Sequence, residues 1–337
     1  MSPVGKRCTE LKTMGLIVNP AAGKDIRRLV AHGSVFGNRE KINYTIRILL
    51  GLDSVVSDPV MVYFMPDPYE LVDTVIDEIR HSLKHLSFEK AAMTVFGDEM
   101  DTVHYTEMAV RRGGISSLVV LGGDGTNRIV ARNSGLIPLF PVSAGTNNVF
   151  ADNIEPTILG MAVGFFIQGV ISSREVLERR KVLRIYRDGQ EKDIALIDAV
   201  LLEKKEIGAR AVWDASLVRL VVVAQTDALK TGLSSIVERI VRVSSDDSRG
   251  AFVRPGKEGK RISAPIAPGL IQELFVSDWG FISPQGSIDI EPTEGVIALD
   301  GERELTIRHQ ERWRVMLDSQ GPVKANIARI MDLSRCS

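Results

Sequence analysis

The sequence predicts a two-domain fold: an α/β amino-terminal domain with a doubly wound parallel sheet, followed by an all-β, sandwich-like second domain. Strand and helix patterns alternate over the first half of the chain, whereas the second half carries strand patterns without long helices between them. The length of 337 residues suits two domains, and the 44% hydrophobic content supplies enough apolar side chains for two cores.

The domain limits follow from the same change of pattern. A charged run at residues 175–181 marks the passage to the β-rich half. We therefore place the α/β nucleotide-binding domain at 1–176, the β-rich substrate domain at 177–310, and a C-terminal segment at 311–337 that can return to the first domain.

In the first domain, short apolar runs that end in turn residues predict strands, and apolar residues at three- and four-residue steps predict helices. In chain order we expect strands at 15–20 and 60–66, a helix at 71–83, a strand at 93–97, a helix at 101–112, strands at 117–121 and 136–140, and a buried helix at 158–171. Strands that alternate with helices in this way favour a parallel sheet.

In the second domain, the sequence predicts hairpins and single strands. Asp188-Gly189 between two strand-like runs is a hairpin signal within residues 183–202. Further strands are expected in 217–225, 270–278, 286–292, 295–308 and 313–317, and the polar, glycine-containing segment 246–261 is expected to be an exposed loop.

The composition limits the binding partners and the cellular compartment that we expect for the protein. The 42 basic residues are balanced by 43 acidic ones, so a nucleic-acid partner is not expected. Cys8 and Cys336 form no metal-ligand or disulfide pattern, which favours a reducing, cytoplasmic setting. Residues 158–171 are too few to span a membrane and include Gln168, so integral membrane association is not expected.

A glycine-rich turn, Gly122-Gly123-Asp124-Gly125-Thr126, directly follows the apolar run 118–121. Glycines permit positive φ angles and close backbone approach, and backbone amides at the start of the following helix favour a phosphate group. Asp124 could bind Mg²⁺, directly or through water, or accept a proton from a hydroxyl. The alternative is a turn with a purely structural role.

A second polar turn, residues 143–148, follows the next strand, so the two turns are expected to form one crevice at the sheet edge. Two other nucleotide motifs are excluded. A P-loop would need glycine at Val18 and Ser or Thr at Asp25, and the spacing of 122–127 does not fit the dinucleotide fingerprint.

Seven segments together resemble a known family: GLIVNPAAGK, LGGDGTNR, SAGTNNVF, ALIDAVLL, KTGLSSI, APIAPGL and ALDGERE. In this order they resemble the ATP-NAD kinase-like family of the acetoin-catabolism X protein type, within the superfamily of NAD kinases, diacylglycerol kinases and sphingosine kinases. The resemblance extends from about Met14 to about Thr306. It implies a two-domain kinase fold, ATP and Mg²⁺ in the cleft between the domains, and a homo-oligomer.

The resemblance also implies roles for individual residues. Residues implied to bind the nucleotide are Asn19, Gly23, Lys24, Gly122, Gly123, Gly125, Thr126, Asn127, Gly145, Thr146 and Asn147. Residues implied to contact the acceptor are Asn148, Asp198, Thr231, Gly232 and Ser234. The implied catalytic residues are Asp124, Asp300 and Glu302, with Asp124 also as the metal ligand. Asp300-Gly301 could instead be a plain hairpin turn, and Thr231 or Ser234 a helix cap.

One position departs from the NAD kinase pattern. NAD kinases carry an asparagine before the acidic residue that recognises NAD, whereas Ile197 precedes Asp198 here. Isoleucine cannot form the hydrogen bonds of an asparagine, and losing such a buried contact costs about 1–3 kcal/mol. We expect an ATP- and Mg²⁺-dependent kinase acting on a hydroxyl of a small soluble acceptor, with NAD the leading candidate. The alternatives are a diacylglycerol or sphingoid lipid kinase and a catalytically silent nucleotide-binding regulator.

Overall fold

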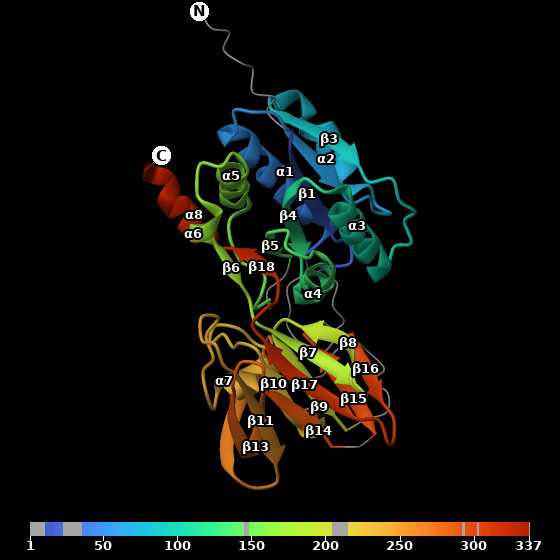
Figure 1. Cartoon of the computed structure of the whole chain (residues 1–337), viewed down its shortest axis with the longest axis vertical. Coiled ribbons are helices and arrows are strands. Elements are labelled where there is room, and N and C mark those ends of the chain that lie inside the picture. Colours follow the sequence, from blue (N-terminus) through green and yellow to red (C-terminus); the bar gives the residue numbers. More distant parts are fainter. Residues whose placement is uncertain are drawn as a thin grey trace, which may run out of the picture.

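The computed structural model describes residues 11–22, 36–144, 148–203, 215–291, 294–301 and 303–336. The chain forms an α/β domain and a β-rich domain, drawn one above the other in Figure 1. Among the described residues, none of the helices is both long and apolar enough to span a membrane.

The α/β domain is built on a seven-stranded sheet with the order β3-β2-β1-β4-β5-β18-β6. All neighbours pair in parallel except β6, which runs antiparallel to β18. The strands are β1 Lys12–Val18, β2 Val60–Phe64, β3 Leu86–Lys90, β4 Ile115–Gly122, β5 Leu139–Ser143, β6 Leu177–Arg179 and β18 Val323–Ala325. The apolar runs predicted at 15–20, 60–66 and 117–121 thus form the centre of the sheet.

Helices cover both faces of this sheet, as expected for a doubly wound fold. The helices are α1 Asn38–Val55, α2 Leu71–Ile79, α3 Glu99–Arg112, α4 Asp124–Asn133, α5 Pro156–Ile167, α6 Ser173–Val176 and α8 Ile327–Leu333. Side chains of α1, α2, α5 and α8 share one buried apolar cluster with the sheet, whereas α3 and α4 contribute to a cluster on the other face.

The β-rich domain consists of two antiparallel sheets packed as a sandwich. The larger sheet has the order β12-β13-β11-β10-β9-β15-β16, and the smaller one β14-β17-β7-β8. The strands are β7 Val182–Arg187, β8 Gln190–Ala195, β9 Asp198–Leu202, β10 Val218–Val223, β11 Gly250–Gly256, β12 Lys260–Ala267, β13 Leu270–Ile282, β14 Ser287–Ile290, β15 Gly295–Leu299, β16 Arg303–Ile307 and β17 Trp313–Asp318. Apolar side chains of both sheets form one buried cluster, and α7 Ser234–Glu238 packs against the larger sheet in another.

The chain passes between the domains twice, at residues 180–181 and at 319–322, which we call the two crossovers. They are hydrogen-bonded to each other: Arg180 N–H donates to the Pro322 carbonyl (2.9 Å), and Gly321 N–H donates to the Arg180 carbonyl (3.0 Å). Strand pairing differs from our domain limits, because β6 belongs to the first sheet and β17 to the sandwich.

Two predicted elements are wrong. Residues 93–97 form no strand, because the edge of the sheet is instead β3, which pairs with β2 through residues 86–90. The loop predicted at 246–261 contains β11 and the start of β12, since Ala251 and Val253 are buried in one apolar cluster and Phe252 packs against the other. The Asp188-Gly189 hairpin is confirmed, with both residues at positive φ between β7 and β8.

Candidate functional site

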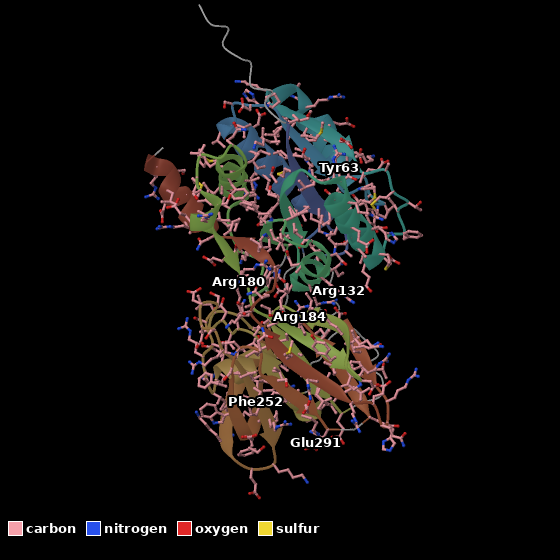
Figure 2. The ribbon with its side chains drawn as sticks, in the orientation of Figure 1. Tyr63, Arg132, Arg180, Arg184, Phe252 and Glu291 are labelled. Atoms are coloured by element: carbon pink, nitrogen blue, oxygen red, sulfur yellow. The ribbon has the colours of Figure 1, made fainter. Side chains whose placement is uncertain are left out.

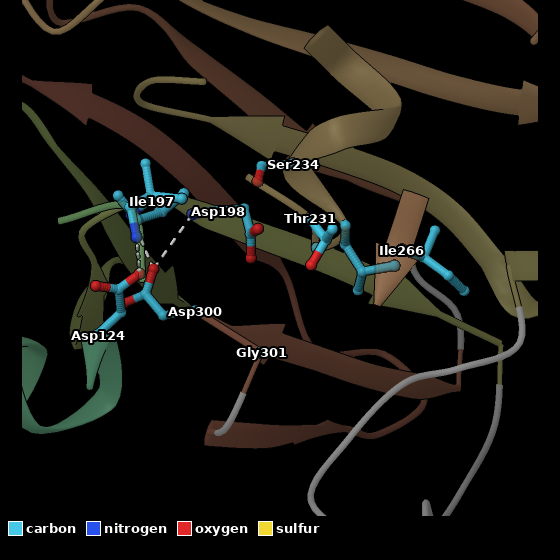
Figure 3. A pocket seen from close by; sticks show the side chains of 11 residues that line it. Asp124, Ile197, Asp198, Thr231, Ser234, Ile266, Asp300 and Gly301 are labelled. Carbon is cyan, nitrogen blue, oxygen red and sulfur yellow. Dashed lines mark hydrogen bonds between the residues drawn. The ribbon is translucent and has the colours of Figure 1, made fainter. Parts of the chain in front are cut away.

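A pocket lies between the two domains and is lined by residues of both (Figure 3). It encloses about 450 Å³, including the part open to solvent. Six of the residues singled out in the sequence line it: Asp124, Asp198, Thr231, Gly232, Ser234 and Asp300. In Figure 3, Asp124 and Asp300 lie at one end of this pocket, and Thr231 and Ile266 lie at the other.

The glycine-rich turn joins β4 to α4. The φ angles of Gly122, Gly123 and Gly125 are not positive, so our expectation of left-handed glycines is wrong for this turn. Close approach is what requires glycine: a Cβ at Gly122 would lie 2.7 Å from Cβ of Thr126. The turn is also tied to β1, because Asn19 Nδ2 donates to Oγ1 of Thr126 (2.7 Å).

The carboxylate of Asp124 accepts hydrogen bonds from the residues that directly follow the second polar turn. Val149 N–H donates to Oδ2 (2.7 Å), and the N–H groups of Phe150 and Ala151 donate to Oδ1 (3.0 and 3.2 Å). Burial raises the pKa of Asp124, and these hydrogen bonds together with the charge of Lys324 oppose that rise. Asp124 therefore organises residues 149–151 as well as lining the pocket.

Asn148 completes the connection between the two polar turns. Its Oδ1 accepts from Asp124 N–H (3.1 Å), and its Nδ2 donates to Oγ of Ser143 (2.7 Å). The predicted meeting of the two turns at the sheet edge is thus present for the described residues. Both polar atoms of the Asn148 side chain take part in this connection, although we had predicted that Asn148 contacts the molecule that accepts the phosphoryl group.

Asp300 has an equivalent arrangement in the β-rich domain. It forms the β15–β16 turn with Gly301, both at positive φ (49° and 72°). Its carboxylate accepts from the N–H groups of Leu196 (3.0 Å), Ile197 (2.8 Å) and Asp198 (3.2 Å). Burial, and then the neighbouring charge of Asp198, raise the pKa of Asp300 to about 8, against the opposing charge of Arg128.

A buried ion pair, which the sequence analysis did not identify, joins the two domains beside this pocket. Arg128 of α4 lies 2.9 Å from Asp193 of β8, with side chains only 5% and 2% exposed. Arg128 Nε also lies 3.9 Å from Oδ2 of Asp300, and Arg132 contacts Asp193 at 3.3 Å. Arg128 follows Asp124 by one helical turn, so the sequence could have indicated that Arg128 lies near the site. No feature of the sequence around Asp193 indicates that it pairs with Arg128.

The remaining pocket residues come from β9 and the start of α7. Gly232 has a φ of 130°, and its N–H donates to the Pro265 carbonyl (3.0 Å). The N-cap position of α7 is Leu233, without a side-chain cap hydrogen bond, so Thr231 and Ser234 are not the caps of this helix. Ile197 is 2% exposed and packs with Phe150 and Leu196, while its N–H serves Asp300.

The other predicted residues either do not line the pocket or fall outside the described residues. Those that do not line it are Asn19, Gly122, Gly123, Gly125, Thr126, Asn127 and Asn148. Those outside the described residues are Gly23, Lys24, Gly145, Thr146, Asn147 and Glu302. Within the described part of the chain, no three His, Cys, Asp or Glu side chains are grouped as a metal site.

Comparison with known proteins agrees with this architecture. The model of the acetoin catabolism protein X C-terminal domain matches residues 181–320, the segment that runs from the first crossover to the second. Acetoin catabolism protein X of Cupriavidus necator is 32% identical over 331 residues, which cover 94% of this chain and 91% of that protein. The chain therefore belongs to the acetoin catabolism protein X family.

Proposed function

We propose that this protein is an ATP- and Mg²⁺-dependent phosphotransferase that phosphorylates a hydroxyl of a small acceptor, with NAD as the first acceptor to test. One observation carries the proposal: residues of both domains that resemble catalytic and acceptor-contacting residues of the NAD kinase superfamily line one pocket between the domains. If NAD is the acceptor, the protein contributes to NADP formation. The name of the Cupriavidus relative points instead to acetoin catabolism as the setting.

The residues present suit ATP and Mg²⁺. Backbone amides of the first turn of a helix have no acceptor within that helix, and they favour a phosphate group. Asp124 N–H is already taken by Asn148, which leaves Gly125 and Thr126 as the amides to hold a phosphate. Mg²⁺ commonly binds through one or two carboxylates together with substrate phosphates, so a site without three clustered ligands remains compatible with it.

The carboxylate of Asp124 can interact with the hydroxyl of the phosphoryl acceptor. A carboxylate has about four acceptor positions, and three of those on Asp124 are taken by backbone amides. The remaining position on Oδ2 is available to align or deprotonate an acceptor hydroxyl. When bound, ATP with Mg²⁺ would supply the phosphoryl group and neutralise its developing charge; positioning by the protein provides most of the remaining catalysis.

Two observations favour the alternatives. The pocket lining includes Val149, Leu233 and Ile266 as well as Ile197, which suits an acceptor with an apolar part, such as a diacylglycerol or sphingoid lipid. The amide-bound carboxylates of Asp124 and Asp300 would also suit a regulator that binds a nucleotide without turnover.

The test is phosphoryl transfer by the purified full chain. Mg²⁺ and γ-labelled ATP are incubated with NAD, NADH, diacylglycerol or a sphingoid base. Wild type is compared with Asp124→Asn and with Asp289→Asn, a control at a 70% exposed carboxylate on β14. We expect label in NADP that is lost in Asp124→Asn and kept in the control.

Other outcomes decide between the alternatives. Label in a lipid would make that lipid the acceptor and overturn the soluble-acceptor proposal. Binding of ATP without label in any acceptor would leave a nucleotide-binding protein. Absence of both ATP binding and transfer would reject the proposed function.

A further inference from the structure

A second cavity, of about 520 Å³ including the part open to solvent, lies where the chain passes between the domains. Gly321 of the second crossover lines it, together with Arg179, the last residue of β6, and Arg184 of β7. Arg132, in the last turn of α4, lines its first-domain side. The cavity therefore touches the second crossover, the residues on either side of the first crossover, and both domains, and Figure 2 shows Arg132 and Arg184 at this junction.

Positive charge predominates in this lining. Its charged residues are Arg132, Arg179, Arg184 and Glu191. Arg184 is paired with Asp318 (2.5 Å) and Glu191 (3.0 Å), and Arg132 with Asp193 (3.3 Å). Arg179 donates to the Gly321 carbonyl (3.0 Å) and has no ion pair among the described residues. Each guanidinium carries five N–H donors, so all three retain donors beyond these contacts.

The two crossovers pack closely against each other, so the backbone beside the cavity is rigid. A Cβ at Gly321 would lie 2.4 Å from the Arg180 carbonyl oxygen and 2.6 Å from Cγ1 of Val182. This contact fixes the backbone beside Arg179 and Arg184, and their guanidinium groups are oriented by hydrogen bonds to the Gly321 carbonyl and to Asp318 and Glu191. A preformed set of guanidinium groups binds a multivalent anion with less loss of conformational entropy than mobile side chains do.

We propose that this cavity, at the hinge between the domains, is a binding site for a small phosphate-bearing anion, separate from the pocket at Asp124. Guanidinium groups match phosphate oxygens in bidentate geometry, which favours phosphate over a single small anion such as chloride. Because α4 carries Asp124 at its start and Arg132 near its end, an anion in the hinge cavity contacts the helix that begins at the candidate active site.

Isothermal calorimetry on the full chain tests the proposal, with inorganic phosphate, pyrophosphate and succinate as probes at constant ionic strength. Arg179→Gln is the main variant, because glutamine removes the charge and keeps an N–H donor; Arg132→Gln is the second. The matched control is Arg261→Gln, which removes a 65% exposed arginine on β12. Asp124→Asn separates the hinge cavity from the first pocket, and thermal unfolding confirms that each variant is folded.

We expect saturable binding of pyrophosphate to wild type, a dissociation constant raised roughly tenfold in Arg179→Gln and Arg132→Gln, and no change in Arg261→Gln. Absence of saturable binding, or equal affinities in wild type and the two cavity variants, would overturn the proposal. Loss of binding in Asp124→Asn would assign the anion to the first pocket. Succinate binding as tight as that of pyrophosphate would overturn the preference for phosphate.

Discussion

The two domains each contribute an Asp-Gly turn to the same pocket, and the two aspartates are bonded alike. Asp124 accepts hydrogen bonds from three successive backbone N–H groups at 149–151, and Asp300 accepts from three at 196–198. In each case one oxygen accepts two of the bonds and the other accepts one. Hydrogen bonding alone therefore gives the two carboxylates no reason to differ.

Their charged surroundings do differ. Burial raises the pKa of both carboxylates; the charge of Lys324 opposes this rise at Asp124, whereas at Asp300 the charge of Asp198 adds to it and that of Arg128 opposes it. Burial and then Asp198 raise the pKa of Asp300 to about 8. Two carboxylates with the same backbone bonding thus differ in the sign of the charges around them.

The largest expected effect comes from removing the charge that compensates Asp300. Arg128→Ala leaves Asp193 buried with only the more exposed Arg132 as a partner, and breaking a buried pair typically costs about 3–5 kcal/mol. Urea unfolding should show a loss of this order. Arg314→Ala, which breaks an exposed pair with Asp289, should cost less than about 1 kcal/mol. Equal losses in the two variants would contradict the importance of the buried pair.

Asp124→Ala should have the next largest effect. It deprives three backbone N–H groups of their acceptor, and we expect the free energy of unfolding to fall by about 3 kcal/mol. Asp124→Asn keeps one carbonyl acceptor and should lose less. Denaturant titrations of the three proteins give the comparison, and an alanine variant as stable as wild type would show that these bonds do not hold the turn.

The glycines of the two turns should respond differently to alanine. Gly122→Ala introduces a Cβ 2.7 Å from Thr126, and overpacking of this kind costs about 1–3 kcal/mol. Gly301→Ala places alanine at a φ of 72°, which costs about 1 kcal/mol. Thermal unfolding of the two variants beside wild type gives the comparison, and a loss at Gly122 smaller than the loss at Gly301 would show that close packing is not what requires glycine at Gly122.

An effect of a different kind, a change in pH dependence, is expected for Asp300→Asn. An unfolded aspartate has a pKa of about 3.9, whereas that of folded Asp300 is about 8, so between these values the folded state alone holds the proton. Stability from this group is complete below about pH 4 and falls as pH rises to about 8, by at most about 1.4 kcal/mol per pH unit.

Asparagine cannot titrate and tolerates the left-handed backbone of this turn, so it mimics the protonated acid. Urea unfolding between about pH 5 and pH 9 should show wild type losing stability relative to the variant as pH rises. Parallel pH profiles for the two proteins would mean that Asp300 is ionised throughout this range.

The sequence was informative wherever a local pattern determines the structure. Strands β1, β2 and β4 are buried on both faces and read as continuous apolar runs, and Asp-Gly pairs mark the β7–β8 and β15–β16 turns. The edge strand was missed because its residues, 86–90, are only half-buried, while the more apolar 93–97 includes Phe96 with 61% exposure. Edge strands are selected by pairing with a neighbour, which no local window contains.

The candidate site was only partly predictable for the same reason. The residue types at Asp124, Asp198 and Asp300 mark a polar site, but the amide-bonding pattern that Asp124 and Asp300 share depends on contacts across the fold. The Arg128–Asp193 pair joins residues 65 positions apart, and nothing in either sequence neighbourhood indicates it. Ile197 shows the reverse: the residue is visible as a departure from a family pattern, yet its packing with Phe150 appears only in the structure.

Hydrogen exchange of wild-type protein with and without Mg²⁺ and ATP tests most directly whether one interdomain pocket is the nucleotide site. The account predicts slower exchange on ATP addition in two segments distant in sequence, 122–127 at the start of α4 and 231–235 at the start of α7. Unchanged exchange in both segments, or protection confined to residues elsewhere in the chain, would contradict it.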